Sequence, residues 1–474
     1  MSLLIQGGMV VTPAEVLEVD ILIADGKIAE IGSNVSESGH ELLDARGLHA
    51  FPGLIDAHVH FNEPGRADWE GLETGSRALA AGGGTLFFDM PLNASPPTLD
   101  AESFNLKLAA AKSKSIVDFA FWGGLVPQNL DHLEELAECG VIGFKAFMSD
   151  SGMEDFPWSD DKVLREGMKR AARLGLPVAV HAESQEMTSR LAEEKIAQGR
   201  KSVQDYLDSR PIPAELDAIR RALDIAGETG CALHIVHVSC GKGVQLITEA
   251  RRRGVDVSCE TCPHYLTLTQ GDMVRIGATA KCAPPLRTIA DQRELWEHVM
   301  AGAVTTIGSD HSPSPLELKR GENFFKVWGG ISGAQHTLSL LLTEIVRETA
   351  RPELKPSQIL HSRFVAGVEN GVLHQQQTLS HLASFLSQGV VKRFNLPKSK
   401  SGIVVGADAD LALVDLDAEF EVRTEDLFYR HAQTPYLGRK LHGRVTRTLV
   451  RGHTVFKDGQ IVSAPLGSLV KPVL

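Results

Sequence analysis

The chain lacks any apolar segment of the kind that crosses a membrane. No apolar run reaches the ~18 residues that a membrane-spanning helix needs, although 43% of the 474 residues are hydrophobic. The first residues, MSLLIQGGMVV, lack the basic segment and the long apolar segment of a secretion signal. The sequence therefore predicts a protein that works in the cytoplasm and has no membrane partner.

Basic residues and cysteines are also sparse. Acidic residues outnumber basic ones by 60 to 48, and the formal net charge is -12. Because Lys and Arg form no long run, no nucleic-acid partner is expected. The six cysteines are scattered along the chain, which predicts reduced thiols rather than a disulfide framework. Cys259 and Cys262 form a CxxC pair, but no second pair completes a zinc ribbon, so a structural role is expected for them.

Strands and helices alternate through the middle of the chain. Eight strands are expected, at residues 52–58, 85–91, 116–124, 140–147, 177–183, 232–239, 255–260 and 303–310. Helical stretches are expected between them, at residues 74–81, 101–112, 131–138, 160–174 and 213–226. The alternation predicts a (β/α)8 barrel of the TIM type, whose chemistry lies at the C-terminal ends of the strands. An open doubly wound sheet is the alternative, and it is disfavoured because no GxGxxG follows the first strand.

The two ends of the chain differ from the middle and are similar to each other. Residues 1–50 and 396–474 contain short β segments, one of them at 403–405. Asp25-Gly26 and Asp458-Gly459 are hairpin signals in these two regions. Neither end is long enough for a core of its own, so we expect one small β-sandwich built from both, with the barrel at 51–395. The sparse periodicity of residues 350–395 suggests a loop and helix insertion within the barrel.

Polar side chains that can bind metals follow the expected strands. Asp56, His58 and His60 alternate along the first strand and so share one face, where His58 and His60 can bind one cation. The remaining candidates end later strands, and they are Lys145, His181, His237 and Asp310. His234 is expected on the opposite face of its strand from His237, where it would only pack. Six candidates on five strands, all at one end of a barrel, predict a metal site.

Lys145 stands in an apolar strand, between Phe144 and Ala146. A buried lysine is costly unless it is paired, and it loses its charge readily. A neutral amine can react with CO2 to form a carbamate, whose oxygens can bridge two cations. The sequence therefore suggests a bridging ligand at this position.

The pattern resembles the amidohydrolase superfamily, and within it the cyclic amidases: allantoinases, dihydroorotases and hydantoinases. The resemblance covers nearly the whole chain, including the divided β-sandwich. It implies two Zn²⁺ ions bridged by N6-carboxylated Lys145. One ion would also bind His58, His60 and Asp310, and the other would bind His181 and His237. It further implies a homotetramer, and hydrolysis of a cyclic amide in which Asp310 moves the proton of the attacking water to the leaving nitrogen.

A few positions distinguish the members of this branch. By this resemblance, dihydroorotases have the pattern HxHxR(D/E)PG after the first strand. The Arg of the pattern pairs with a substrate carboxylate. This chain has Asn62 at that position, and a neutral amide suits an uncharged ring better. The stretches around Asn93 and His311 also resemble allantoinases. Ala283 departs from their pattern, because Ser is expected there in allantoinases and Asn in dihydroorotases.

The resemblance thus implies hydrolysis of allantoin to allantoate in purine breakdown, with Asn62, Asn93, Ala283 and His311 at the substrate. A dihydroorotase or a hydantoinase would use the same metals and differ in the cyclic amide. A non-catalytic scaffold with this fold is a further alternative. It is disfavoured because such scaffolds are depleted in metal ligands, whereas all the ligands are present here.

Overall fold

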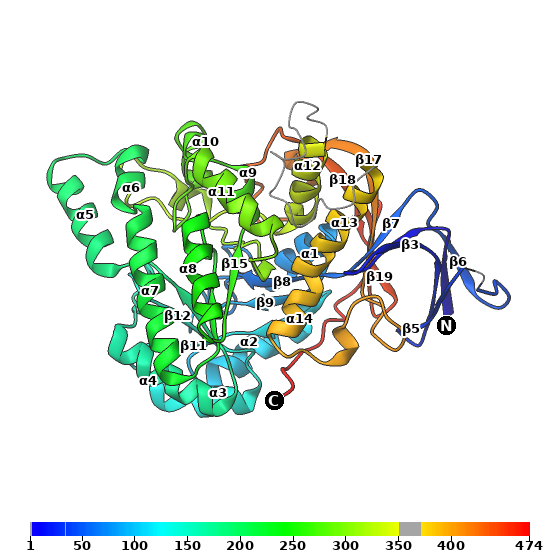
Figure 1. Ribbon diagram of the computed structural model, residues 1–474, viewed down its shortest axis with the longest axis horizontal. Helices are drawn as coiled ribbons and strands as arrows, with labels where there is room; N and C mark the ends of the chain where they lie inside the picture. The colour runs from blue at the N-terminus through cyan, green and yellow to red at the C-terminus, as the bar shows by residue number, and fades with distance from the viewer. Residues whose placement is uncertain (1, 34, 350–370) are drawn as a thin grey trace.

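A ring of parallel strands forms the centre of the computed structural model, which describes residues 2–33, 35–349 and 371–474 (Figure 1). In chain order the strands are β8 (Leu54–Val59), β9 (Gly84–Asp89), β10 (Asp118–Phe121), β11 (Gly123–Gly124), β12 (Phe144–Phe147), β13 (Val178–His181), β14 (Leu233–Ile235), β15 (Val257–Thr261) and β16 (Thr306–Ile307). They pair in this order, and β10 and β11 are two parts of the third barrel strand. The ring closes where the backbone N–H of His60 donates to the carbonyl of His311 (2.8 Å). The predicted (β/α)8 barrel is confirmed.

Helices follow the strands and cover the outside of the ring (Figure 1). They are α1 (Leu72–Ala81), α2 (Ala101–Lys114), α3 (Leu133–Cys139), α4 (Asp161–Leu174), α5 (Gln185–Ala197), α6 (Val203–Ser209), α7 (Ile212–Thr229), α8 (Gly241–Arg252), α9 (Pro263–Thr267), α10 (Gln270–Ile276), α11 (Ile289–Met300) and α12 (Thr337–Thr349). The helix expected at 213–226 is longer at both ends. It continues past Gly227 and stops at Gly230, whose φ of 69° ends the helix in the left-handed conformation. Pro213 is tolerated because the first turn has no intrahelical acceptor for its N–H groups.

Strands from both ends of the chain build the β-sandwich. Its strands are β1 (Ser2–Gln6), β2 (Met9–Val11), β3 (Val16–Glu18), β4 (Asp20–Ala24), β5 (Lys27–Gly32), β6 (Glu41–Asp44), β7 (His49–Pro52), β17 (Leu411–Glu421), β18 (Lys440–Val450), β19 (His453–Lys457) and β20 (Gln460–Ile461). One sheet has the order β5-β4-β1-β6 and the other β20-β19-β18-β17-β7-β2-β3. Antiparallel pairing of β7 with β17 joins the two ends. The predicted sandwich is confirmed, whereas the domain limits at residues 50 and 395 stay a prediction.

Local signals in the two ends had different outcomes. Both expected hairpins form, between β4 and β5 at Asp25-Gly26 and between β19 and β20 at Asp458-Gly459. All four turn residues have positive φ, as a two-residue hairpin turn requires. The strand expected at 403–405 is wrong. Gly402 and Gly406, with φ of 85° and 90°, flank this segment and bend it.

The segment expected to be an insertion is described only in part. Residues 350–370 lie outside the described residues. The rest is helical, with α13 (Gly371–Ala383), a π-helical turn at Ser384–Gln388 and α14 (Gly389–Arg393).

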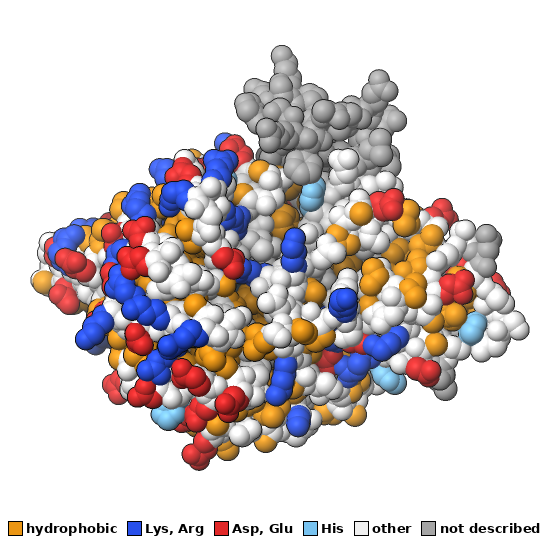
Figure 2. Space-filling view, turned by 60° about the horizontal axis from the view of Figure 1, so that its bottom comes forward, with side chains coloured by type: hydrophobic (Ala, Val, Ile, Leu, Met, Phe, Trp, Pro, Cys, Tyr) orange, Lys and Arg blue, Asp and Glu red, His pale blue; other side chains and the backbone are white. Residues whose placement is uncertain are grey.

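The surface charges and the thiols agree with what the sequence predicts. On the face drawn in Figure 2, basic and acidic side chains are interspersed. Within the described residues, no helix is both long enough and apolar enough to span a membrane. The six cysteines are free thiols.

A buried ion cluster ties the sandwich to the barrel. Lys400 Nζ lies 2.6 Å from Asp118 Oδ2, at the start of β10, and 2.6 Å from Asp410 Oδ2, just before β17. Arg451 pairs with Asp118, and its backbone N–H donates to Asp410 Oδ1 (2.7 Å). Burial disfavours the Lys400 ammonium, but the two carboxylates outweigh it and raise its pKa above the usual range. Each buried charge of the cluster therefore has a neighbour of the opposite sign.

We expect Lys400→Met to lower the free energy of unfolding by about 3–5 kcal/mol, because it leaves the buried Asp410 carboxylate without its ion-pair partner and Asp118 with Arg451 alone. Lys400 is 7% exposed. Equilibrium urea unfolding measures the loss. Lys27→Met is the control, since the Lys27 side chain is 51% exposed and its partner Asp408 keeps a second ion pair with Lys400; about 1 kcal/mol or less is expected there. Equal losses in the two variants would contradict the assignment.

Candidate metal centre

The first group of candidate ligands lies where the barrel closes. His58 and His60 come from β8 and its end, and Asp310 follows β16. His58 Nε2 is 3.3 Å and His60 Nε2 is 3.4 Å from Asp310 Oδ1. One ligand atom from each residue lies within 4.8 Å of the others, a spacing that suits one metal ion. Burial opposes the charge of Asp310, but the surrounding imidazoles hold its pKa well below the usual range, so it is an anionic donor.

The second group lies at the end of β13 and just after the neighbouring strand β14. His181 Nδ1 is 3.0 Å from His237 Nε2. The other nitrogen of His181, Nε2, is 2.9 Å from Glu183 Oε2. A carboxylate accepts the Nε2–H, which leaves the lone pair of Nδ1 directed at His237. The ring centroids of His237 and His58 are 5.4 Å apart, so the two groups adjoin.

Lys145 lies on β12, inside the same end of the barrel. Its side chain is fully buried, and Nζ has no hydrogen-bond partner. Burial lowers the pKa of this amine to about 7, against the raising effect of Asp310 and Glu260. A buried amine in this state is suited to carbamate formation. Together with imidazole and carboxylate donors, it fits a pair of divalent cations such as Zn²⁺.

Several residues at this end have left-handed backbone. The φ angles are 63° at Asn62, 67° at Asn93, 39° at His237 and 46° at Asp310. Non-glycine residues avoid this region, and their clustering is typical of functional sites. All four residues lie beyond the end of a strand, in the loop that follows it, where period-two alternation no longer holds.

The break at His237 explains why the expected role of His234 was only partly met. His234 is buried and contacts Ser258 Oγ (2.7 Å), as a packing residue would. However, His234 Nε2 lies 3.9 Å from Glu260 Oε2, and the His237 N–H donates to Oε1 of the same carboxylate (3.4 Å). Both residues therefore border the barrel interior, and their expected separation onto opposite faces is wrong.

Asp56 is not part of either group. Its Oδ1 accepts hydrogen bonds from the backbone N–H groups of Ser309 (3.0 Å) and His58 (3.2 Å). The pairing of β8 with β9 is irregular between Asp56 and Val59, so the expected common face of Asp56, His58 and His60 is not regular. Asp56 instead anchors the backbone just before Asp310. Burial raises its pKa to about 6.

Two carboxylates that sequence reasoning missed complete the centre. Glu260, on β15, lies 2.7 Å from His58 Nδ1. Glu183 has the equivalent contact with His181. Each carboxylate binds the ring nitrogen that faces away from its group, which fixes the ring and its tautomer. Burial opposes both charges, but the neighbouring groups lower the pKa of each to about 2. An acidic residue inside an expected strand was the signal for Glu260.

The residues expected at the substrate have different surroundings. Asn62 is buried and donates weakly to the carbonyl of Pro313 (3.4 Å), while its Oδ1 has no hydrogen-bond partner. Asn93 Nδ2 lies 3.3 Å from His60 Nδ1. His311 accepts the N–H of Gly333 at Nδ1 (3.2 Å).

His311 and Ala283 are held by neighbours on other loops. His311 Nε2 faces Glu70 Oε2 at 3.4 Å, and neither side chain is exposed. Ala283 is half-buried. Tyr206 donates to the carbonyl before it and Tyr265 to the carbonyl after it, at 2.9 and 2.7 Å.

The chain is similar to known proteins over nearly its whole length. The profile of the Amidohydrolase family matches residues 50–455. An allantoinase from Rubrobacter xylanophilus is 52% identical, over 99% of this chain and 98% of that protein. One from Deinococcus radiodurans is 48% identical, over 100% and 99%. Among solved structures, an L-hydantoinase (dihydropyrimidinase) from Arthrobacter aurescens is 32% identical, with a TM-score of 0.90 over 99% of both chains.

Proposed function

Because the chain belongs to the amidohydrolase family, we propose that it is a metal-dependent hydrolase that opens the hydantoin ring of allantoin to give allantoate. The environment of Lys145 is the main structural support for hydrolytic chemistry. This lysine is buried without a hydrogen-bond partner at the end of the barrel where the two histidine groups meet. The full-length relatives named allantoinase support the substrate. The homotetramer and the cytoplasmic location stay predictions.

The proposed centre holds two Zn²⁺ ions. His58, His60 and Asp310 would hold one, His181 and His237 the other, and carboxylated Lys145 would contribute an oxygen to each. When bound, the two cations polarise the amide carbonyl and lower the pKa of a water so that it can attack near neutral pH.

Asp310 is the proposed catalytic base. Its carboxylate takes the proton of the attacking water and then delivers it to the leaving nitrogen, acting as base and afterwards as acid. The low pKa of Asp310 keeps it ionised. Glu260 and Glu183 keep His58 and His181 in the required tautomers. Asn93 and Glu70 are proposed to position His60 and His311, rather than to contact the substrate.

Asn62 is the proposed contact with the substrate, because its buried Oδ1 is unpaired. An amide oxygen accepts a hydrogen bond from a ring or ureido N–H, and it repels a carboxylate. This supports an uncharged ring and disfavours dihydroorotate. Ala283 contributes no polar side-chain atom, so any polar contact there is made by its backbone.

A hydantoinase is the second candidate, because solved hydantoinases have the same fold. The two candidates are separated by kcat/KM for allantoin, hydantoin, dihydropyrimidine and dihydroorotate, measured on the zinc-loaded protein. We expect allantoin to be the best substrate. Preference for any other ring would reject the proposal. A protein that binds no zinc and turns over none of them would favour the scaffold alternative.

We expect Asn62→Arg to lower kcat/KM for allantoin by about 10–100-fold, because the guanidinium crowds the ring and stays unpaired. Steady-state kinetics on allantoin and dihydroorotate measure the change. Gln198→Arg, at the exposed end of α5, adds the same charge far from the centre and is the control. Unchanged allantoin kinetics in Asn62→Arg would remove Asn62 from the substrate site without affecting the metal assignment.

A further inference from the structure

The carboxylates behind the two histidine groups have different electrostatic surroundings. Glu260 accepts from His58 Nδ1 through Oε1, and its Oε2 has no hydrogen-bond partner. Its ion-pair neighbours are His58 and His234. Among the described residues, no lysine or arginine pairs with Glu260. Its ion pairs among the described residues are therefore with imidazoles alone.

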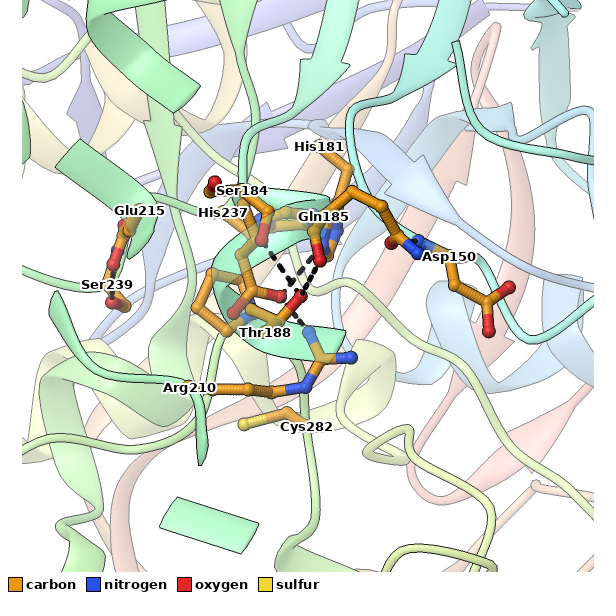
Figure 3. Close-up of polar contacts among 12 residues, drawn as sticks. Asp150, His181, Ser184, Gln185, Thr188, Arg210, Glu215, His237, Ser239 and Cys282 are labelled. Carbon is orange, nitrogen blue, oxygen red and sulfur yellow. Dashed lines mark hydrogen bonds and ion pairs between the residues drawn. The ribbon is translucent and has the colours of Figure 1, made fainter. Parts of the chain in front are cut away.

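Glu183 has a cationic partner. The oxygen that faces His181, Oε2, also receives a hydrogen bond from Arg210 Nη1. Arg210 reaches this point from the loop between α6 and α7, and Figure 3 shows its guanidinium directed toward the side chains around His181. Glu183 is fully buried and Arg210 is 19% exposed, so solvent screens this pair only weakly.

A second guanidinium holds Arg210 in place. Arg287 Nη1 donates to the backbone carbonyl of Arg210 (2.6 Å). Arg287 is itself fixed by Glu215 (2.9 Å) and Ser239 Oγ (2.8 Å). Contacts with Glu183 and with Arg287 therefore fix the position of Arg210.

These contacts have opposite consequences for the two groups. A carboxylate on the far nitrogen makes an imidazole a better donor to a cation. A guanidinium bonded to the same carboxylate oxygen takes up part of that negative charge. His58 thus has an uncompensated carboxylate behind it, and His181 has a compensated one.

We propose that Arg210 weakens the binding of a divalent cation at His181 and His237, so that the two cations dissociate one after the other. The inference rests on the binuclear centre proposed above. Arg210 is a positioning residue, because it acts through Glu183 and His181 and not on the substrate. The cation at His58, His60 and Asp310 is the one retained longer.

The test counts cations and uses no substrate. The zinc-loaded protein is equilibrated at stepped concentrations of free Zn²⁺, set by a chelator, and zinc per chain is measured by atomic emission. We expect wild type to lose its cations in two steps. In Arg210→Gln the step at higher free Zn²⁺ should move about 10-fold lower, the scale of effects from such outer residues. The second step should not move.

Two further variants separate charge from shape. Arg210→Lys keeps the positive charge and should keep the wild-type steps. Glu183→Gln should move the first step about 10–100-fold toward higher free Zn²⁺, because His181 loses the carboxylate behind it. Arg165→Gln breaks an exposed ion pair with Glu228 and should change neither step.

Three results would overturn the inference. One is simultaneous loss of both cations from wild type, and another is a shift of both steps together in Arg210→Gln. The third is a first step that moves to higher free Zn²⁺ in that variant, since it would mean that Arg210 only holds Glu183 in place. Binding of fewer than two Zn²⁺ under all conditions would refute the binuclear centre itself. Failure on allantoin alone would refute the substrate and leave the cation result standing.

Discussion

Lys145→Ala is expected to bind neither cation and to lose at least about 10⁴-fold in kcat/KM for allantoin, because the bridge and with it the activated water are gone. The reason lies in the surroundings of the amine, which is buried and has no partner apart from the groups of the proposed centre. Metal analysis and steady-state kinetics measure the two losses. Added short carboxylic acids should restore part of both, by replacing the bridging oxygens.

Lys319 provides a matched control for Lys145. It is also buried, and burial lowers its pKa to about 7 as well. Unlike Lys145, it donates to backbone carbonyls, those of Ala278, Trp328 and Gly330. Lys319→Ala should therefore keep both cations. Two cations in untreated Lys145→Ala would rule out the bridging role.

Asp310→Asn is expected to keep most of its metal and to lose about 10²–10⁴-fold or more in kcat, since the amide cannot accept a proton. The amide oxygen remains a possible ligand, and His58 and His60 are unchanged. Zinc content and single-turnover rates measured on one preparation separate the two effects. Asp131→Asn, an exposed change near α3, is the control. Near wild-type turnover in Asp310→Asn would show that another group moves the proton.

The metal-binding candidates could be predicted because their signal is local. His58 and His60 recur at strand spacing, and Lys145 and Asp310 follow apolar runs that read as strands. In a closed barrel all strand ends meet on one side, so sequence order was enough to bring these residues together.

The supporting carboxylates could not be predicted in the same way. Glu183 is two residues from His181 in the sequence, but Glu260 is 202 residues from His58. Their function depends on which ring nitrogen each one contacts, and this is set by the three-dimensional arrangement of the side chains. The same turns explain why β14 and β16 are shorter than the expected strands at 232–239 and 303–310.

The pairing of β7 with β17 has a consequence for biosynthesis. One edge of β7 is covered early, by β2, but the partner of the other edge begins at Leu411. At about 5–20 residues per second, a ribosome needs on the order of twenty seconds to a minute to reach that partner. During this interval the nascent chain carries an open strand edge, which can pair with other chains. The barrel segment, whose strands are all made earlier, can fold while the N-terminal strands wait.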